Sequence, residues 1–235
     1  MIELAGSAAH VVVDGLDAPA LTRDDEHHLS RVLRLRPAER VTATDGRGSW
    51  RWCRWTGGGI EPDGPVHTVP KQEPGLTVAF AIVKGDRLDW IVQKLTEVGI
   101  DRLVPLVAER SIVRWDATKA DAQIERLRRI AREAAMQSRR VWLPEVAPLT
   151  RAASFLAEPG VSRADFDGVS LDDLGDGAPV VVAVGPEGGW SGAERGLGGP
   201  SVRLGETVLR AETAAVAAGV LLVDRRSRQR GVSLP

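Results

Sequence analysis

The pattern of apolar and polar positions divides the chain into an N-terminal part with short strands and a longer part in which strands and helices alternate. Before residue 70, short apolar or β-prone runs stand between turn residues at 11–13, 41–44, 49–55 and 66–69. A helix start at Thr22 precedes one short helix, 27–35, with Leu29, Val32 and Leu33 predicted to face inward. The pattern predicts a small all-β domain.

From residue 76 the apolar residues begin to recur with helical spacing between strands. Strands are predicted at 76–83 and 103–107, and the helix between them begins after Asp86 and stops at Gly99. A long amphipathic helix follows at 120–138, with Arg126, Arg128, Arg129 and Arg132 on its polar face, and a weak strand is predicted at 161–166. This alternation predicts an open α/β domain with a parallel sheet. A Gly- and Pro-rich stretch sets the predicted boundary, giving domains 1–72 and 73–235.

The C-terminal part of the second domain contains the strongest candidate for a ligand site. A buried strand at 180–184 ends in Gly185-Pro186-Glu187-Gly188-Gly189. Pro186 cannot continue a strand ladder, Gly185 can adopt a positive φ, and Gly188 and Gly189 leave backbone amides uncovered. Ligands of open α/β sheets lie outside the carboxyl ends of the strands, so this loop is a candidate site, with a plain tight turn as the alternative.

Two further segments are expected to converge on the same pocket. Leu204-Gly205 stands at the end of the short apolar segment 201–204. Residues 209–213 lead into an apolar run, 214–223, that is predicted to be a helix buried on every side. Such a helix fits either a covered core or a dimer interface.

Composition excludes several classes of protein and leaves others open. The chain has 235 residues with 31 basic and 32 acidic side chains, so net charge does not indicate a nucleic-acid partner. Local basic clusters at 110–140 and 225–230 fit either a phosphate footprint or solvated helix faces. Trp50, Trp52 and Trp55 fit either a base-stacking surface or core packing. Cys53 is the single cysteine, so no intrachain disulfide can form.

The same inventory predicts neither a metal site nor membrane insertion. The four histidines lack metal-ligand spacing, and no apolar run is long enough to cross a bilayer. A cytoplasmic protein without a metal is therefore expected. A P-loop is not indicated either, because the glycine loop lacks the Lys-Ser/Thr that follows it in such nucleotide sites.

The motifs of the C-terminal part resemble those of a known family. Val184 to Gly189, then Leu204-Gly205, then Leu209-Arg210 with Glu212-Thr213-Ala214, are similar to the C-terminal motifs of the RsmE family, the uridine-N3 methyltransferases of small-subunit ribosomal RNA in the SPOUT superfamily. Upstream matches extend the resemblance over about the whole chain: His28-Leu29, Val32-Leu33-Arg34, Lys84-Gly85-Asp86, Gln93-Lys94, Glu97, Gly99, Arg110-Ser111, Glu133-Ala134, Gln137, Arg140 and Pro144.

The resemblance implies a fold, a cofactor and a substrate. It implies a SPOUT-type open parallel sheet with a C-terminal trefoil knot, preceded by a PUA-like β-barrel domain that binds RNA, and a homodimer joined through the last helix. It also implies S-adenosylmethionine as methyl donor and N3 of U1498 in 16S ribosomal RNA, within the small ribosomal subunit, as the acceptor. The chain departs from the family at Ala9-His10-Val11, where an arginine followed by aromatic residues is usual, and at Arg139, where glycine is common.

Site residues follow from the same resemblance. The cofactor-binding positions that it implies are Gly185, Pro186, Gly188, Leu204, Gly205, Leu209, Thr213 and Ala214. Those implied to contact RNA are His28 and Arg34 in the β domain, and Arg110, Gln137 and Arg140 in the catalytic domain. Ion pairs of Arg110 with Glu109 and of Arg140 with Glu133 are the structural alternatives.

The chemistry of uridine N3 indicates which side chains the reaction needs. N3 carries a proton and becomes nucleophilic only when that proton is lost, after which negative charge spreads onto O2 and O4. Arg210 is the candidate cation for this anion, because the helix dipole disfavours an arginine at a helix start for stability alone. Glu187 is a candidate base, or it shapes the loop. Two other functions stay open: methylation of another RNA such as tRNA, and a non-catalytic RNA-binding protein of ribosome assembly.

Overall fold

The computed structural model describes residues 4, 6–177 and 180–231. Its contacts divide the chain into two compact units. Unit 1 comprises Met1–Gln72 and Arg132–Leu143, and unit 2 comprises Glu73–Ala131 and Pro144–Pro235. The segment Arg132–Leu143 therefore belongs to unit 1, although the predicted division at residues 72 and 73 assigns it to the second domain.

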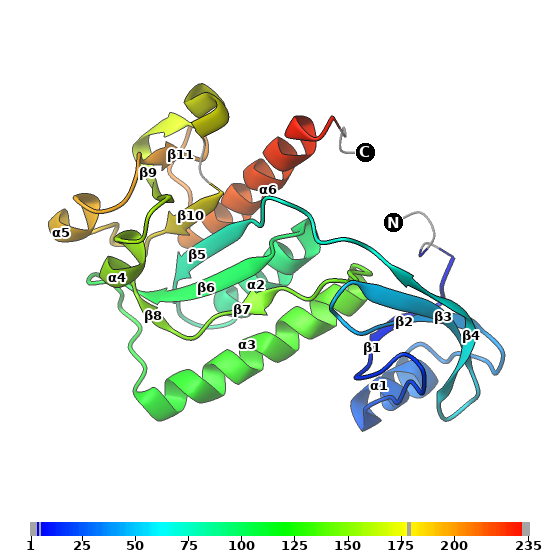
Figure 1. Cartoon of the computed structure of the whole chain (residues 1–235). Helices are drawn as coiled ribbons and strands as arrows, with labels where there is room; N and C mark the ends of the chain where they lie inside the picture. Colours follow the sequence, from blue (N-terminus) through cyan, green and yellow to red (C-terminus); the bar gives the residue numbers. More distant parts are fainter. Residues whose placement is uncertain (1–3, 5, 178–179, 232–235) are drawn as a thin grey trace. The chain divides into compact units, whose positions relative to one another are not determined.

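Unit 1 is built on a four-stranded sheet (Figure 1). Its strands are β1 (His10–Val12), β2 (Arg40–Thr44), β3 (Ser49–Trp55) and β4 (Ile60–Thr68), in that spatial order. β1 runs parallel to β2, whereas β2, β3 and β4 form antiparallel pairs. The Asp45 carboxylate closes the predicted turn between β2 and β3 by accepting bonds from the backbone N–H groups of Arg47 and Ser49.

Strand β4 is longer than predicted. Only 66–69 was expected to be extended, because Pro62, Gly64 and Pro65 are poor strand residues. The structure extends the strand back to Ile60. β4 lies at the edge of the sheet, where one side of the backbone needs no ladder partner, so the prolines are tolerated there.

The short helix of unit 1 is irregular, and this changes which residues it buries. α1 (Arg23–His27) begins at its N-cap Thr22 as predicted, but the chain continues as a π-helix, η2 (His28–Val32). Leu29 is buried, whereas Val32 is 60% exposed and Leu33 is 42% exposed, so their predicted inward orientation is wrong. The wider turn of the π-helix rotates Val32 off the face of Leu29, and Leu33 already lies at the helix end.

The core of unit 1 includes two of its tryptophans. Trp50 and Trp55 are buried, which confirms core packing for both. Trp52 is partly exposed, and the guanidinium of Arg40 lies 4.1 Å from the centre of its ring. The stacking surface that the tryptophan run suggested is thus reduced to one ring, which an arginine covers.

The segment Arg132–Leu143 is fastened to unit 1 by charged and backbone bonds. Arg132 donates to both carboxylate oxygens of Asp25, at 3.0 and 2.6 Å, and to the carbonyl of Val12. It was expected on the solvent face of its helix, and the structure contradicts this because Asp25 is buried and needs a cationic partner. Arg139, with φ at 55°, donates to the carbonyl oxygens of Leu4 and Ser7.

Unit 2 is an open α/β unit, and its sheet is parallel as predicted. The strands are β5 (Thr77–Ala81), β6 (Arg102–Val107), β7 (Glu145–Val146), β8 (Thr150–Arg151), β9 (Val161–Ser170), β10 (Val181–Val184) and β11 (Val202–Arg203). Their order is β11-β9-β10-β5-β6-β7, with β8 paired to β6, and every pair is parallel. Because β10 lies between β5 and β9, the glycine loop follows a central strand.

Helices cover both faces of this sheet (Figure 1). One core joins the sheet to α2 (Arg87–Val98), to the first part of α3 (Ala117–Gln137) and to α6 (Ala211–Gln229). The other joins it to α4 (Ala152–Leu156) and to Trp190, which precedes α5 (Gly192–Arg195). A short 3-10 segment, η3 (Asp172–Gly177), follows β9. Gly99 ends α2 with φ at 106°, as expected for a glycine C-cap.

Helix α6 differs from its prediction. Ala215, Ala218 and Leu222 are buried, but Val220 on another side is 45% exposed, so the helix is not covered all round.

Among the described residues no helix is long and apolar enough to cross a membrane. The trefoil knot stays a prediction.

Candidate active-site pocket

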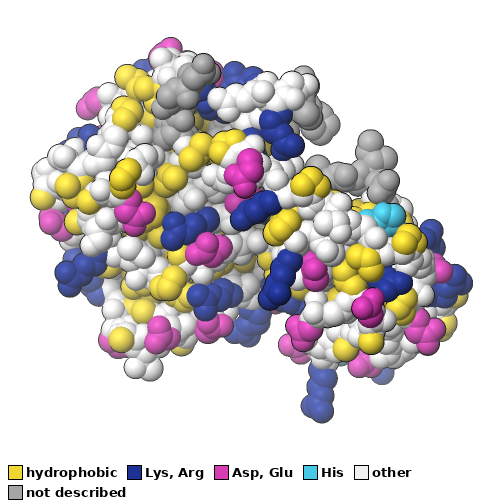
Figure 2. All heavy atoms as spheres, in the orientation of Figure 1, with side chains coloured by type: hydrophobic (Ala, Val, Ile, Leu, Met, Phe, Trp, Pro, Cys, Tyr) yellow, Lys and Arg dark blue, Asp and Glu magenta, His cyan; other side chains and the backbone are white. Residues whose placement is uncertain are grey.

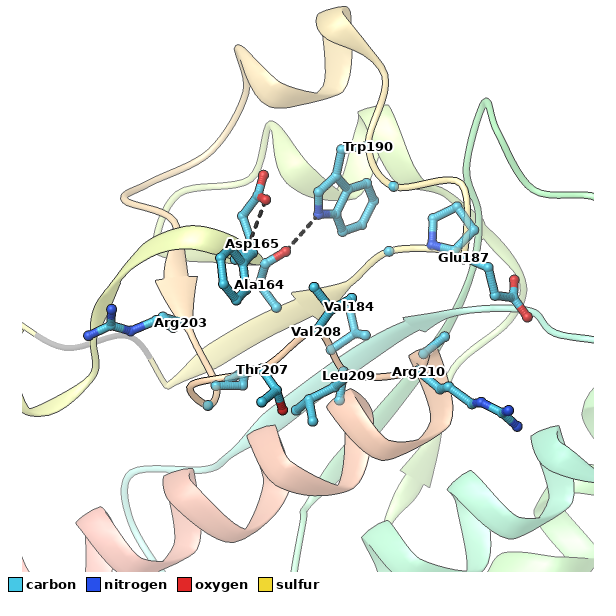
Figure 3. A pocket seen from close by; sticks show the side chains of 18 of the residues that line it. Ala164, Asp165, Val184, Glu187, Trp190, Arg203, Thr207, Val208, Leu209 and Arg210 are labelled. Atoms are coloured by element: carbon cyan, nitrogen blue, oxygen red, sulfur yellow. Dashed lines mark hydrogen bonds between the residues drawn. The ribbon is translucent and has the colours of Figure 1, made fainter.

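A pocket of about 400 Å³ lies at the carboxyl end of β10 (Figure 3). It collects the three segments that were expected to converge: Gly185 and Pro186 from the glycine loop, Leu204 and Gly205 after β11, and Leu209 and Ala214 at the start of α6. Its other lining residues are Ala164, Asp165, Phe166, Val184, Glu187, Gly189, Trp190, Arg195, Arg203, Thr207, Val208, Arg210 and Ala211. Helices and strands distant in sequence thus form one concave, mainly apolar site.

Trp190 determines the shape of the glycine loop. It is buried, and its indole N–H donates to the carbonyl of Ala164 at 3.0 Å. A Cβ atom on Gly185 would lie 3.0 Å from the tryptophan ring, so glycine is needed there for close approach rather than for a positive φ. The left-handed residue is Gly189, with φ at 68°, and its N–H donates to the carbonyl of Pro186. The prediction that the Gly189 amide is uncovered is therefore wrong, because this N–H already has a partner within the loop.

Another part of the lining comes from β9, next to Trp190, and the sequence did not connect this segment with the site. Ala164, Asp165 and Phe166 line the pocket, and Asp165 pairs with Arg195 at 3.0 Å. Phe166 is 52% exposed, and Val208, another lining residue, is 83% exposed. The weak strand predicted at 161–166 forms the first part of β9, but only the strand order shows that β9 borders β10.

Charged side chains mark the two ends of the pocket. Figure 3 shows Arg203 at one end, and Glu187 and Arg210 at the other. Arg210 is the N-cap residue of α6, with φ at −65° and ψ at 154°, and its side chain is exposed. Within the described part of the chain the Arg210 guanidinium forms no hydrogen bond or ion pair, although the Arg210 carbonyl accepts a bond from the Ala214 N–H. The helix dipole adds no stabilisation to a cation at this end, so local stability does not explain Arg210.

Glu187 has a partner outside the pocket. Its carboxylate accepts a bond from Arg87 at 3.2 Å, and the same guanidinium lies 3.6 Å from Glu212 at the start of α6. Arg87 is the first residue of α2, so it links the glycine loop to the starts of α2 and α6. Arg87 and Glu187 are each about 40% exposed, so water screens this pair and its contribution to stability is small.

Two predicted cofactor residues lie outside the pocket lining. The carbonyl of Gly188 accepts a bond from the guanidinium of Arg110 at 3.2 Å, and a Cβ on this glycine would lie 3.4 Å from that of Arg110. Thr213 is exposed on α6. Their role in cofactor binding stays a prediction.

The residues predicted to contact RNA divide between the two units. Arg110 is exposed in the loop after β6. His28 and Arg34 are exposed in unit 1, where Arg34 has φ at 54°. Gln137 and Arg140 also belong to unit 1, which corrects their placement in the catalytic domain, because the segment that carries them packs on the β sheet.

The surface of the molecule carries basic and acidic side chains side by side. On the face that Figure 2 shows, Lys and Arg side chains are interspersed with Asp and Glu side chains. Arg110 bonds to the Gly188 carbonyl, and no ion pair with Glu109 is found among the described residues. In that part of the chain no group of His, Cys, Asp or Glu side chains is arranged to hold a metal ion.

Comparisons with known proteins agree with this architecture. A family model described as an RNA methyltransferase domain matches residues 71–223, and one described as an RNA methyltransferase PUA domain matches residues 21–54. The ribosomal RNA small subunit methyltransferase E of Synechocystis is 35% identical over 219 residues, covering 84% of this chain and 70% of its own length. The protein of the same name from Mycobacterium tuberculosis is 31% identical, covering 92% of this chain and 86% of its own.

Solved structures show the same fold. The structure of ribosomal RNA small subunit methyltransferase E from Neisseria gonorrhoeae, bound to S-adenosyl methionine, superimposes with a TM-score of 0.77 at 28% identity and covers 92% of this chain and 97% of its own. A structure from Legionella pneumophila that holds the bound cofactor SAM gives a TM-score of 0.79 at 26% identity, with 91% and 96% covered. Since the motifs, the parallel sheet and the relatives all agree, this chain belongs to the ribosomal RNA small subunit methyltransferase E family.

Proposed function

We propose that the protein transfers a methyl group from S-adenosylmethionine to N3 of a uridine in 16S ribosomal RNA of the small ribosomal subunit. The observation that carries this proposal is Arg210, an exposed cation without a partner in the described residues, at the rim of an apolar pocket. Family membership supports the reaction class, and the position U1498 follows from the resemblance of the motifs.

The pocket suits an adenosine-containing cofactor. Its volume of about 400 Å³ lies within the range typical of small-molecule sites. Val184, Leu204 and Leu209 offer apolar contacts for a base and a ribose, with the backbone of Gly185 and Gly205 close by. S-adenosylmethionine supplies an electrophilic methyl group on a sulfonium, so no covalent protein intermediate and no metal are required. The protein has to align the reactants and exclude water.

Arg210 is proposed as the catalytic cation. Loss of the N3 proton leaves a negative charge shared by O2 and O4 of the uracil, and a guanidinium beside them stabilises this anion. Glu187 is proposed to shape the loop rather than to act as the base, because Arg87 already holds its carboxylate.

The RNA is proposed to be bound by both units. N3 lies on the Watson–Crick edge, so the target base has to be unpaired or extruded when it reaches the pocket. His28, Arg34, Gln137 and Arg140 of unit 1 and Arg110 of unit 2 are the proposed contacts. Unit 1 would serve mainly as the RNA-binding domain and unit 2 as the catalytic domain.

We also infer a homodimer. Helix α6 leaves Val220 45% exposed beside the partly buried Val216 and Ala217, an apolar stripe on a helix whose other side is in the core. A second copy of the chain would cover that stripe through a two-fold contact.

Nucleoside analysis by mass spectrometry tests the reaction. Purified protein and S-adenosylmethionine are incubated with unmodified small subunits, naked 16S ribosomal RNA and tRNA. New 3-methyluridine in the ribosomal samples alone, mapped to one position, is the expected result. Methylation of tRNA would favour the alternative substrate. Cofactor binding without methylation of any RNA would favour the non-catalytic alternative.

A further inference from the structure

Glu194 is a buried carboxylate that the reaction does not use. It is 1% exposed and lies in α5, next to the pocket residue Arg195. Burying a carboxylate is costly unless its oxygens accept hydrogen bonds. Both oxygens of Glu194 do so: Oε2 accepts from the backbone N–H of Ser191 and Oε1 from the backbone N–H of Glu109, each at 2.9 Å. No ion pair to Glu194 is found in the described ranges.

The two donors belong to different parts of the site. Ser191 follows the pocket residue Trp190, and its hydroxyl accepts from the Glu194 N–H, which completes a capping box for α5. Glu109 precedes Arg110 in the loop after β6, 85 positions away from Glu194 in the sequence. One carboxylate thus connects the pocket wall to the loop that carries Arg110.

Helix capping alone does not account for this arrangement. α5 has four residues, and the capping box needs only the bond between Glu194 and Ser191. The bond to Glu109 lies outside it. That loop has further local supports: the Ala108 N–H donates to the Ser111 hydroxyl, and Arg114 donates to the Glu109 carbonyl. A second bond ties this loop to the glycine loop, because Arg110 donates to the Gly188 carbonyl.

We propose that Glu194 is a positioning residue that locks the Arg110 loop to the wall of the cofactor pocket, so that Arg110 meets RNA in one fixed orientation. This inference rests on the proposed function, in which Arg110 contacts the RNA substrate. Glu194 is buried and does not line the pocket, so its role is to position the loop. Its carboxylate is suited to the task because it presents two acceptors to two N–H donors, and no neutral side chain of the same length does so.

Glu194→Gln is the main test variant, because glutamine has the same shape but one acceptor in place of two. One of the two N–H donors is then left facing an amide NH2 group. We expect the affinity for naked 16S ribosomal RNA to fall about 10-fold. The KM for RNA should rise, while kcat at saturating RNA and the Kd for S-adenosylmethionine should stay within about twofold of wild type.

Ser191→Ala is the matched control. It removes the hydroxyl that caps α5 but leaves the bond between Glu194 and Glu109 in place. RNA affinity should stay at the wild-type value. Amide hydrogen exchange of the free protein adds a readout without RNA: exchange at Glu109 should be faster in Glu194→Gln and unchanged in Ser191→Ala.

A double-mutant cycle with Arg110→Ala decides whether Glu194 acts through Arg110. If it does, Glu194→Gln causes no further loss of RNA affinity in the Arg110→Ala background. An equal loss in both backgrounds, or wild-type RNA affinity and wild-type exchange in the single variant, would overturn the inference. Failure of the proposed function looks different, because the wild-type protein would then methylate no ribosomal RNA at all.

Discussion

The two units use their basic side chains in opposite ways. In unit 1, Arg132 is bound by Asp25 and a backbone carbonyl, and Arg139 donates to two more carbonyl groups. At the pocket of unit 2, Arg203 and Arg210 are exposed and have no such partner among the described residues. Arginine content alone does not distinguish these sites.

The difference shows which arginines stabilise the fold and which are available to a ligand. A guanidinium whose donors are already bound to protein contributes to stability but has little left for a substrate. A hydrated guanidinium contributes little to stability and can bind an anion without breaking an internal bond. Variants at the two kinds of site should therefore change different quantities.

The largest effect is expected at Arg210. Replacing it with Ala should lower the rate of methyl transfer at saturating substrates roughly 100- to 1000-fold, the cost of removing one group that stabilises a developing anion. The Kd for S-adenosylmethionine by calorimetry and the melting temperature should stay near wild type, because the side chain has no internal partner. Arg203→Ala is the control at the other end of the pocket. Equal losses of cofactor binding and turnover in Arg210→Ala would contradict the assigned role.

Arg132→Met should give the largest loss of stability. It leaves the buried carboxylate of Asp25 without its cation, at a cost of about 2–3 kcal/mol in the free energy of unfolding. Arg129→Met in the same helix is the control, because Arg129 is exposed and its change should stay within about 0.5 kcal/mol. Urea denaturation of the two variants measures both values. A similarly small loss in each would mean that the ion pair with Asp25 adds no more to stability than an exposed arginine does.

His10 should make stability depend on pH. The pKa of His10 is lowered from 6.5 to about 4. Burial is the largest cause, the bond to the Arg140 carbonyl opposes it, and the charge of Arg139 adds to the lowering. The folded state therefore holds neutral His10 where the unfolded chain already binds a proton. The contribution of neutral His10 to the free energy of unfolding is fully present above pH 6.5. It is lost, by up to about 1.4 kcal/mol per pH unit, as the pH falls towards 4.

His10→Gln removes this titration while keeping a group that can bond to the Thr42 hydroxyl. Urea unfolding of both proteins at several values between pH 4 and 7 should give a shallower dependence for the variant. Parallel curves would contradict a buried, neutral His10.

The smallest effect is expected at Glu187. Glu187 is a half-exposed partner of Arg87. Its replacement by Gln should therefore change the free energy of unfolding by less than about 0.5 kcal/mol and the rate of methyl transfer by less than about 10-fold. A general base would cost roughly 100-fold or more when removed, together with a changed pH–rate profile. Comparing these profiles in wild type and Glu187→Gln separates the two roles.

The sequence by itself determined the α/β class, the β-α-β unit from β5 to β6, the strand and glycine loop that form the pocket, and the family. These features depend on local signals: apolar periodicity, the Gly99 C-cap, and motifs whose residues lie close together in the chain. The sequence left core packing and base stacking open for Trp50, Trp52 and Trp55, and only the structure shows that Trp50 and Trp55 are buried.

Only the tertiary structure decided the rest. It shows that Gln137 and Arg140 belong to unit 1 and that Val32 and Leu33 are exposed. It also shows that β9 lines the pocket and that Glu194 accepts a bond from a loop 85 residues away in the sequence. Such features depend on pairing between distant segments. Neither the partner of a buried charge nor the order of strands in a sheet leaves a periodic trace in the sequence, because both are set by packing of the whole chain.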